Sequence, residues 1–250
     1  MRSEKIRFKG TYGMLSARLD QPDDIPRNYA LFAHCFTCTK DILAAAHICT
    51  ELTSHGIAVL RFDFSGLGNS EGDFANTNFS SNIADLIAAV EWLRSNHRPP
   101  SLLIGHSLGG AAVLATASDI PEAKAVATIG APAEPSHVIK NFTKDYERIA
   151  SEGEAEVYLA GRPFRIKKQF LDDIETHRLR QRIAQLGRAL LVCHSPIDDT
   201  VGIENASEIF AAAKHPKSFL SLDGADHLLR GNEAAIYTGR VIAAWASRYI

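Results

Sequence analysis

A serine between two glycines limits what this chain can fold into more than any other part of the sequence. Gly105-His106-Ser107-Leu108-Gly109 follows the apolar run 102–104 and precedes the helix-forming run 111–115. A strand that turns this sharply into a helix needs glycine, because neighbouring backbone must approach closely. We expect Ser107 at the tip of the turn, with its hydroxyl exposed above the N-terminus of the helix. The alternative is a glycine-rich turn that contains a serine by chance.

Apolar, β-rich runs alternate with helix-period segments along most of the chain. This alternation indicates an α/β fold, with a mostly parallel central sheet flanked by helices. The expected strands are residues 5–9, 14–20, 29–33, 58–63, 102–105, 125–129, 189–193 and 218–222. The expected helices are residues 42–54, 79–96, 108–117, 206–213 and 234–249. Asp41 is expected to cap the first of these helices.

The alternation is interrupted once, between Pro132 and Gly187. Residues 156–166 predict a hairpin that turns at 160–162, and residues 170–185 predict a helix. A segment of this length is too short to bury a core of its own. We therefore expect one domain over residues 1–250 with a small cap inserted at about 133–186. Its aromatic side chains either line an acyl or aryl pocket or form the core of the cap: Phe142, Tyr146, Tyr158, Phe164 and Phe170.

A serine hydroxyl becomes a good nucleophile only when a base takes its proton, and a carboxylate must orient that base. In a strand–turn–helix architecture of this kind the partners follow in the order serine, acid, histidine. The strand at 189–193 leads into Asp198 and Asp199, and the strand at 218–222 leads into a loop that ends at His227. Both loops should meet Ser107, since the carboxyl ends of parallel strands share one edge. His227 is the expected base; chemistry alone leaves the choice between Asp198 and Asp199 open.

The composition argues against several other classes of protein. The chain has 27 basic and 29 acidic side chains, for a net charge of −2, so it offers no basic field for nucleic acid or an anionic membrane. No signal peptide or membrane-length apolar run is apparent. Four cysteines do not form a disulfide framework. We expect a cytoplasmic enzyme with a small-molecule substrate, and the sequence leaves the oligomeric state open.

Taken together, these residues make the whole chain resemble an α/β-hydrolase-fold serine hydrolase, an esterase. The stretch 63–70 is similar to the structural loop Asp-x-x-Gly-x-Gly-x-Ser of that family. The stretch 194–201 resembles its His-Gly-x-x-Asp-x-x-Val acid loop, which implies Asp198 as the catalytic acid and Asp199 as the alternative. The stretch 34–37 resembles its His-Gly-Phe-Thr oxyanion loop. That resemblance implies the backbone N–H groups of Phe36 and Leu108 as the oxyanion donors.

Two phrases, residues 34–41 and 161–166, are also similar to the hydrolase half of proteins that fuse this fold to an osmotically inducible protein C type domain. The chain stops at Ile250 without such a domain, so it is either a stand-alone relative or part of a longer protein. The resemblance implies hydrolysis of esters with small acyl or aryl groups through an acyl-enzyme, with no cofactor or metal. Thioester or small-amide hydrolysis is the alternative with the same residues. Non-catalytic ligand binding is the alternative from another class.

Cys35 and Cys38 are spaced like a redox or metal-binding pair. We expect them to pack under the oxyanion loop as thiols, with a regulatory thiol pair or a metal site as the alternatives. If they did form a disulfide, it would constrain Phe36 between them, and oxidation would then be expected to lower turnover. Cys49 and Cys193 are expected to be small buried hydrophobic residues.

Overall fold

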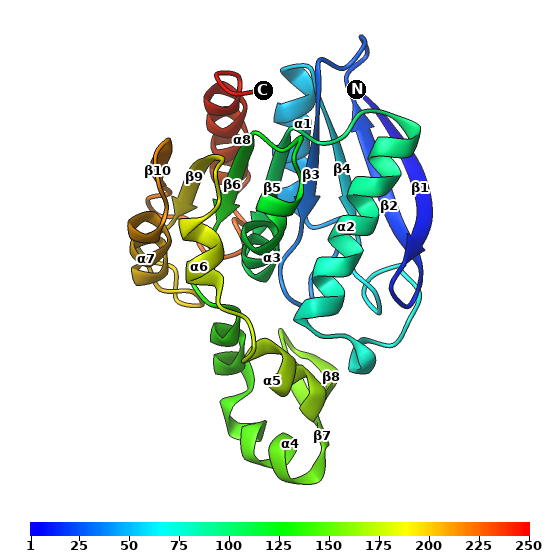
Figure 1. The fold of residues 1–250 in the computed structure, drawn as a ribbon, viewed down its shortest axis with the longest axis vertical. Helices are drawn as coiled ribbons and strands as arrows, with labels where there is room; N and C mark the ends of the chain where they lie inside the picture. The colour runs from blue at the N-terminus through cyan, green and yellow to red at the C-terminus, as the bar shows by residue number, and fades with distance from the viewer.

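An eight-stranded sheet forms the centre of the computed structural model, which describes residues 1–250 (Figure 1). Across the sheet the order is β1 (Arg2–Gly10), β2 (Gly13–Gln21), β4 (Ile57–Phe62), β3 (Asn28–Ala33), β5 (Leu102–His106), β6 (Ala125–Ile129), β9 (Ala189–His194) and β10 (Lys217–Ser221). The β1–β2 and β2–β4 pairs are antiparallel, and all the other pairs are parallel. The predicted α/β fold with a mostly parallel sheet is confirmed.

Helices cover both faces of this sheet (Figure 1). On one face α1 (Leu43–Ser54) packs against α8 (Asn232–Ala246). The other face carries α2 (Phe79–Asn96), α3 (Leu108–Thr116), α6 (Leu179–Ala184) and α7 (Glu204–Ala212). Short 3₁₀ helices occupy Phe74–Asn76 and Ala117–Asp119. None of these helices combines the length and the hydropathy that a membrane span requires.

The central strands are apolar throughout because both of their faces are buried. In β3, Ala30 and Phe32 belong to a cluster of 24 buried hydrophobic residues, while Leu31 and Ala33 belong to a second cluster of 49. Successive side chains of a strand point to opposite faces, so one strand contributes to both cores. Because both faces are packed, the carboxyl ends of these strands are held in place, and so are the starts of the loops that follow them.

The structure corrects two of the predicted helix features. Asp41 does not cap α1, whose N-cap residue is Ile42 and has no side-chain cap. The Asp41 carboxylate instead accepts hydrogen bonds from Arg18 at 2.8 Å and Arg61 at 3.1 Å. These charged donors form stronger hydrogen bonds than the backbone N–H groups at the start of α1 would. The single helix predicted over residues 170–185 is also wrong. Two helices, α5 (Lys168–Ile174) and α6, occupy that stretch, and α6 packs on α3 and α7.

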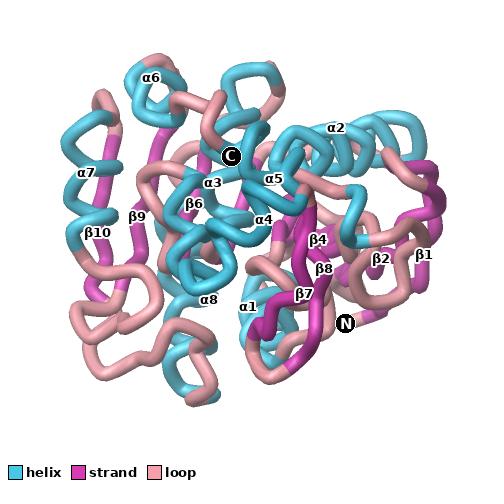
Figure 2. The backbone as a smooth tube through the Cα atoms, turned by 90° about the horizontal axis from the view of Figure 1, so that it is seen from below, coloured by secondary structure: helices cyan, strands magenta, loops and turns pink.

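Between β6 and α6 the chain forms a lobe that projects beyond the carboxyl ends of the strands (Figure 1). It consists of a 3₁₀ segment (Pro135–Asp145), α4 (Tyr146–Glu152), β7 (Glu154–Leu159), β8 (Arg162–Lys167) and α5. The predicted hairpin is present: β7 and β8 pair antiparallel around Ala160 and Gly161, which both have positive φ. Viewed from below, α4, β7 and β8 lie in front of the ends of the central strands (Figure 2). We call this lobe the cap.

Candidate active site

The turn between β5 and α3 holds Ser107 in a conformation that L residues rarely adopt. Its backbone has φ 54° and ψ −124°. The turn fits only because the residue two positions on is glycine. A Cβ on Gly109 would lie 2.4 Å from the carbonyl oxygens of both Ala33 and His34. The neighbouring loop after β3 can therefore approach the serine closely, as the predicted sharp turn requires.

Ser107, His227 and Asp198 are brought together at the carboxyl edge of the sheet. The Ser107 hydroxyl lies 3.0 Å from His227 Nε2, and His227 Nδ1 lies 2.7 Å from Asp198 Oδ2. Each of the three residues is 8% exposed. They follow β5, β10 and β9, so three parallel strands deliver them to one point. With the Nδ1 proton donated to Asp198, Nε2 is free to accept the proton of the serine hydroxyl.

The acid loop distinguishes Asp198 from Asp199. Asp198 Oδ1 accepts hydrogen bonds from the backbone N–H groups of Val201 at 2.8 Å and Thr200 at 3.0 Å. Burial raises the pKa of Asp198, but the hydrogen bonds from His227 and these two N–H groups outweigh it, so the pKa lies below its ordinary value. Asp199 is exposed and its side chain contacts Thr200 Oγ1 instead. Only Asp198 therefore reaches the imidazole.

Two further histidines hold the loops of the site rather than the serine. His106 Nε2 lies 2.7 Å from the carbonyl oxygen of His227, and His194 Nε2 lies 2.7 Å from that of Val201. Burial, followed by the nearby His227, lowers the pKa of His106 to about 4, so this ring is a neutral donor. Sequence reasoning missed both of these contacts. Their only signal was the position of each histidine at the end of a strand.

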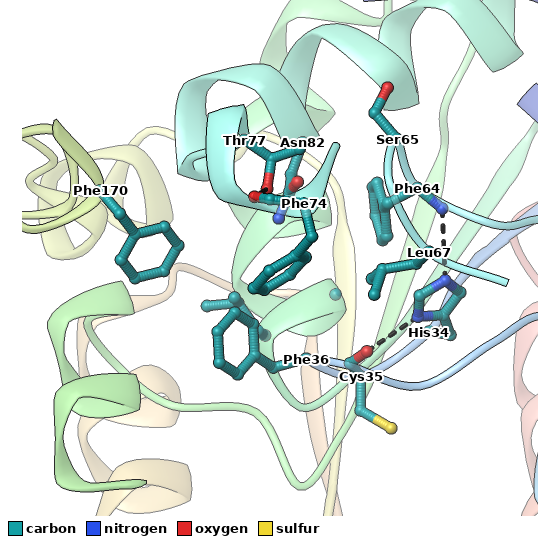
Figure 3. Close-up of a pocket in the computed structure, with 12 residues that line it drawn as sticks. His34, Cys35, Phe36, Phe64, Ser65, Leu67, Phe74, Thr77, Asn82 and Phe170 are labelled. Atoms are coloured by element: carbon teal, nitrogen blue, oxygen red, sulfur yellow. Dashed lines mark hydrogen bonds between the residues drawn. The ribbon is translucent and has the colours of Figure 1, made fainter. Parts of the chain in front are cut away.

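The loop after β3 and the start of α3 each present one of the two N–H groups that the family resemblance assigns to an oxyanion, Phe36 and Leu108 respectively. No side chain or loop carbonyl accepts a hydrogen bond from the N–H of Phe36 or Leu108. His34 supports the loop, since its Nδ1 donates to the Cys35 carbonyl oxygen at 2.8 Å and its Nε2 accepts from Phe64 N–H at 3.4 Å (Figure 3). Burial lowers the pKa of His34, which favours this neutral form.

Cys35 and Cys38 are joined by a disulfide, so the prediction of two packed thiols is wrong. The chain turns between them with Thr37 at φ 60°, and Cys38 N–H donates to the Cys35 carbonyl oxygen at 3.1 Å. This turn brings the two Cα atoms to 5.2 Å, within the usual range for a disulfide. The disulfide closes a small covalent ring that includes the backbone of Phe36 and Thr37. Cys49 and Cys193 are free and buried, as predicted, and burial raises the pKa of both thiols.

A buried charge network holds the far end of this loop. Asp63, which is fully buried, accepts from the backbone N–H of Lys40 at 2.6 Å and from its ammonium at 2.7 Å. Arg61 donates to the Lys40 carbonyl oxygen at 2.6 Å. Both backbone groups of Lys40 are thus fixed by charged partners, and hydrogen bonds of this kind are the strong ones. The stretch 63–70, which resembles a structural loop of the family, therefore positions the oxyanion loop.

Two cavities adjoin the oxyanion loop, one on either side of Phe36. The larger is about 530 Å³ and reaches Ser107 and His227. The smaller is about 10 Å³, room for roughly one water, and is bordered by Phe36, Phe74 and Phe170 together with Leu108 (Figure 3). The Phe36 ring centroid lies 5.7 Å from the centroids of both Phe74 and Phe170.

The aromatic residues of the cap divide between the two predicted roles. Phe170 and Tyr158 line the cavities, on the small and the large side respectively. Phe142 is 3% exposed and belongs to the hydrophobic core, and Phe164 packs edge-on against Phe74. Across the whole chain, no group of three or more His, Cys, Asp or Glu side chains is placed to hold a metal ion.

Comparisons with known proteins agree with this geometry. A family model described as serine aminopeptidase S33 matches residues 38–152. The solved esterase domain of a Rhodothermus marinus protein is 50% identical, with 100% of this chain and 99% of that chain covered and a TM-score of 0.81. The ferulic acid-bound structure of Est1E from Butyrivibrio proteoclasticus is 19% identical, covering 97% and 99%, with a TM-score of 0.80.

A curated human relative is named palmitoyl-protein thioesterase ABHD10, mitochondrial, and is 26% identical over 166 residues, or 64% of this chain. The chain spans about half the length of that relative, 52%. The fold, the site and the full-length match to the Rhodothermus esterase domain define the class: this chain belongs to the α/β-hydrolase family. Its relatives include an esterase domain and a thioesterase.

Proposed function

We propose that this protein is a serine hydrolase that cleaves carboxylic esters of small acyl or aryl groups through an acyl-enzyme intermediate. The observation that carries the proposal is the unbroken chain of hydrogen bonds from Asp198 through His227 to Ser107. A serine that was only structural would need neither a base within hydrogen-bonding distance nor an acid behind that base.

In the first half of the reaction, Ser107 Oγ attacks the ester carbonyl while His227 Nε2 takes the hydroxyl proton. The carbonyl oxygen becomes negative and accepts hydrogen bonds from the free N–H groups of Phe36 and Leu108. His227 then gives the proton to the alkoxide oxygen as the C–O bond breaks. Asp198 remains a carboxylate and stabilises the imidazolium, consistent with its lowered pKa.

In the second half, a water molecule takes the place of the alcohol. His227 removes a proton from the water, the hydroxide attacks the acyl carbonyl, and the same two N–H groups bind the oxyanion. The proton returns to Ser107 Oγ as the carboxylic acid leaves. Every step uses groups of this chain and the substrate, so we expect no cofactor or metal.

The preference for a small acyl or aryl group rests on the narrow cavity beside Leu108. Its free space is about 10 Å³, so a short chain or a flat ring requires only a small shift of Phe36, Phe74 and Phe170, whereas a long chain requires a large one. The ferulic acid bound to Est1E is an aryl acid and supports the same preference.

Thioester hydrolysis is the second candidate, favoured by the name of the human thioesterase relative. The same residues would attack a thioester carbonyl, and His227 would then protonate a thiolate. Esters and thioesters of one acyl group, compared by kcat/KM, decide between the two activities. A non-catalytic ligand-binding role remains the alternative from a different class. The cytoplasmic location remains an expectation from the sequence.

A fluorophosphonate probe tests the proposal, because it labels only an activated serine. We expect one label per chain on Ser107, identified by mass spectrometry, and hydrolysis of 4-nitrophenyl acetate. Ser107→Ala should prevent labelling and lower kcat by at least about 10⁵-fold, with an unchanged circular dichroism spectrum. A Ser107→Ala variant that keeps a tenth of the turnover would rule out this serine as the nucleophile.

A further inference from the structure

The two cavities differ in charge: the larger one is lined by two arginines, and no Lys or Arg lines the smaller one. We propose that the larger cavity binds the alcohol or thiol half of a substrate that carries a carboxylate or phosphate, held by Arg162 and Arg230. This inference rests on the proposed function, since it assumes that Ser107 and His227 cleave the bond. It adds the charge of the leaving group, which the catalytic residues do not specify.

The position of His227 identifies the larger cavity as the side of the leaving group. His227 must protonate the departing oxygen or sulfur, so that atom has to lie beside its Nε2. The larger cavity is lined by Ser107 and His227, whereas neither residue borders the smaller one. The acyl group therefore lies toward Phe74 and Phe170, and the leaving group lies under the cap hairpin.

Arg162 brings an unpaired positive charge to this cavity. It stands at the start of β8, and its guanidinium donates to the Thr37 carbonyl oxygen and lies 5.3 Å from the centre of the Phe164 ring. No Asp or Glu carboxylate lies within 4.0 Å of it. The hydrogen bond to the Thr37 carbonyl oxygen leaves other N–H donors of the guanidinium available, since it has five.

Arg230 supplies a second guanidinium, three residues after His227 on the same loop. Its Nε lies 3.6 Å from Asp226, a loose contact, and its side chain is 77% exposed. Neither Asp226 nor any other Asp or Glu is among the residues that line the cavity. Two arginines face this space without an acidic residue between them, so its local potential is positive.

The neutral groups around the two arginines also suit an anion. Thr37, Thr39 and Asn141 line the same cavity and can donate hydrogen bonds. A guanidinium binds the two oxygens of a carboxylate or phosphate through parallel N–H donors. No Arg or Lys lines the cavity on the acyl side. A single substrate would therefore be oriented by charge, with its uncharged acyl half beside Phe74 and its anionic half beside Arg162.

Two esters that differ only in charge test the proposal: 4-nitrophenyl acetate and its carboxylated analogue 5-acetoxy-2-nitrobenzoate. The readout is the ratio of kcat/KM for the anionic ester to that for the neutral ester. We expect Arg230→Gln and Arg162→Gln each to lower this ratio by about fivefold, the usual size of one partly exposed charge contact. The double variant should lower it further, and Arg162→Lys should keep most of it.

Arg165→Gln is the matched control. Arg165 lies on the same strand β8, its side chain is 62% exposed, and it faces Glu154 at 3.4 Å instead of the cavity. Its substitution should leave the ratio unchanged. In wild type, 1 M NaCl should lower the ratio as well, because it shortens the screening length to about 3 Å. Arg162 also contacts the oxyanion loop, so Arg162→Gln can lower kcat/KM for both esters. The ratio of the two values still reports the charge effect, because a loss common to both esters cancels in it.

Benzoate and phenyl phosphate, used as inhibitors of the neutral reaction, distinguish the two anions. Stronger inhibition by either than by neutral phenol supports the proposal and names the preferred group. A ratio that neither arginine substitution nor salt changes would overturn it. That outcome is separable from failure of the proposed function, in which even the neutral ester would not be hydrolysed in a Ser107-dependent way.

Discussion

The carboxyl edge of the sheet and the cap above it are assembled in different ways, although both border the same cavity. At the edge, the loops after β5, β9 and β10 bring Ser107, Asp198 and His227 together, and each residue is 8% exposed. The cap has a two-stranded hairpin and short helices, and its tip residues Ala160 and Gly161 are exposed. At the edge, β5 and β9 are buried on both faces and β10 pairs with β9, whereas the cap is held to the main body by buried side chains of its short elements.

This difference suggests a division of roles. Catalysis needs atoms placed within a fraction of an ångström, and the rigid strand ends provide that placement. Selection of substrate needs only the right charge and shape, which the cap supplies through side chains such as Arg162 and Phe170. Substitutions at the edge should therefore abolish turnover, whereas substitutions in the cap should change stability or preference.

The largest expected effect separates two adjacent carboxylates of the edge. Asp198→Asn should lower kcat by about 10⁴-fold, since an amide no longer holds the productive tautomer of His227. Asp199→Asn should change kcat by less than about threefold, because Asp199 is exposed and makes no contact with the imidazole. Steady-state kinetics with 4-nitrophenyl acetate measures both. If Asp199→Asn were the inactive variant instead, the acid loop would be out of register by one residue.

The same glycine-to-alanine change should lower kcat in one region and only the stability in the other. At Gly109 the new Cβ would lie 2.4 Å from two carbonyl oxygens of the loop after β3, so that loop must move and kcat should fall by about 10²-fold. At Gly153, which ends α4 in the cap with φ 88°, no atom lies within 4 Å. We expect Gly153→Ala to lower the free energy of unfolding by about 1–2 kcal/mol through the positive φ alone, with kcat unchanged. Equal kcat values in the two variants would remove the distinction between the regions.

Acid should destabilise the edge through His106. Its folded-state pKa of about 4 lies below the ordinary value, so between pH 6.5 and pH 4 the unfolded chain binds a proton that the folded chain does not. Stability should be fully present above pH 6.5 and fall as the pH drops, by up to about 1.4 kcal/mol per pH unit from this one group. His34, whose pKa is also lowered, acts in the same direction.

Urea unfolding at several pH values between 7 and 4.5 measures this slope. His106→Gln keeps a donor for the His227 carbonyl oxygen but has no titrating ring, so its profile should be flatter by about one proton. Gly153→Ala should shift the whole profile down without changing its slope. A His106→Gln profile parallel to wild type would mean that another group is responsible for the acid loss.

The sequence predicted the edge better than the cap, for physical reasons that differ between residues. Apolar runs that alternate with helix-period segments and a Gly-x-Ser-x-Gly turn are local signals, and they suffice for Ser107 and for the mostly parallel sheet. His227 follows because parallel strands end at one edge. Asp198 was separated from Asp199 only through the resemblance to a family loop, since adjacent carboxylates are chemically alike.

Other features depend on segments that meet only in the folded chain. Asp41 was expected to cap a helix, but Arg18 from β2 and Arg61 from β4 bind it instead. The break between α5 and α6 arises because α6 packs on the main body. The hydrogen bond from Arg162 to Thr37 links residues 125 positions apart, and no local sequence pattern predicts it. Contacts of this kind depend on the tertiary structure and could not be predicted from the sequence.

The smallest expected effect lies where the two regions meet, at the disulfide between Cys35 and Cys38. From the sequence, forming this bond was expected to lower turnover. In the structure the bond is present and the N–H of Phe36 is still free, which reverses the expected direction. We expect reduction by a phosphine to lower kcat by about tenfold, because the ring around Phe36 opens and Thr37 is left to the Arg162 contact alone. The loss should stay below the roughly 10²–10³-fold cost of losing one oxyanion donor outright, since His34 and the Lys40–Asp63 pair still hold both ends of the loop.

Thiol counting alongside kinetics makes this last expectation decisive. Reduction of the folded protein should expose two new thiols, because Cys49 and Cys193 are buried and their raised pKa values keep them unreactive. Reoxidation should restore both the thiol count and kcat. The double variant Cys35→Ser, Cys38→Ser should have the lowered kcat and no response to the reductant, while Cys49→Ala should respond as wild type does. Two titrated thiols with an unchanged kcat would show that the buried network around Asp63 holds the oxyanion loop without help from the disulfide, and the loop would then belong wholly to the rigid edge.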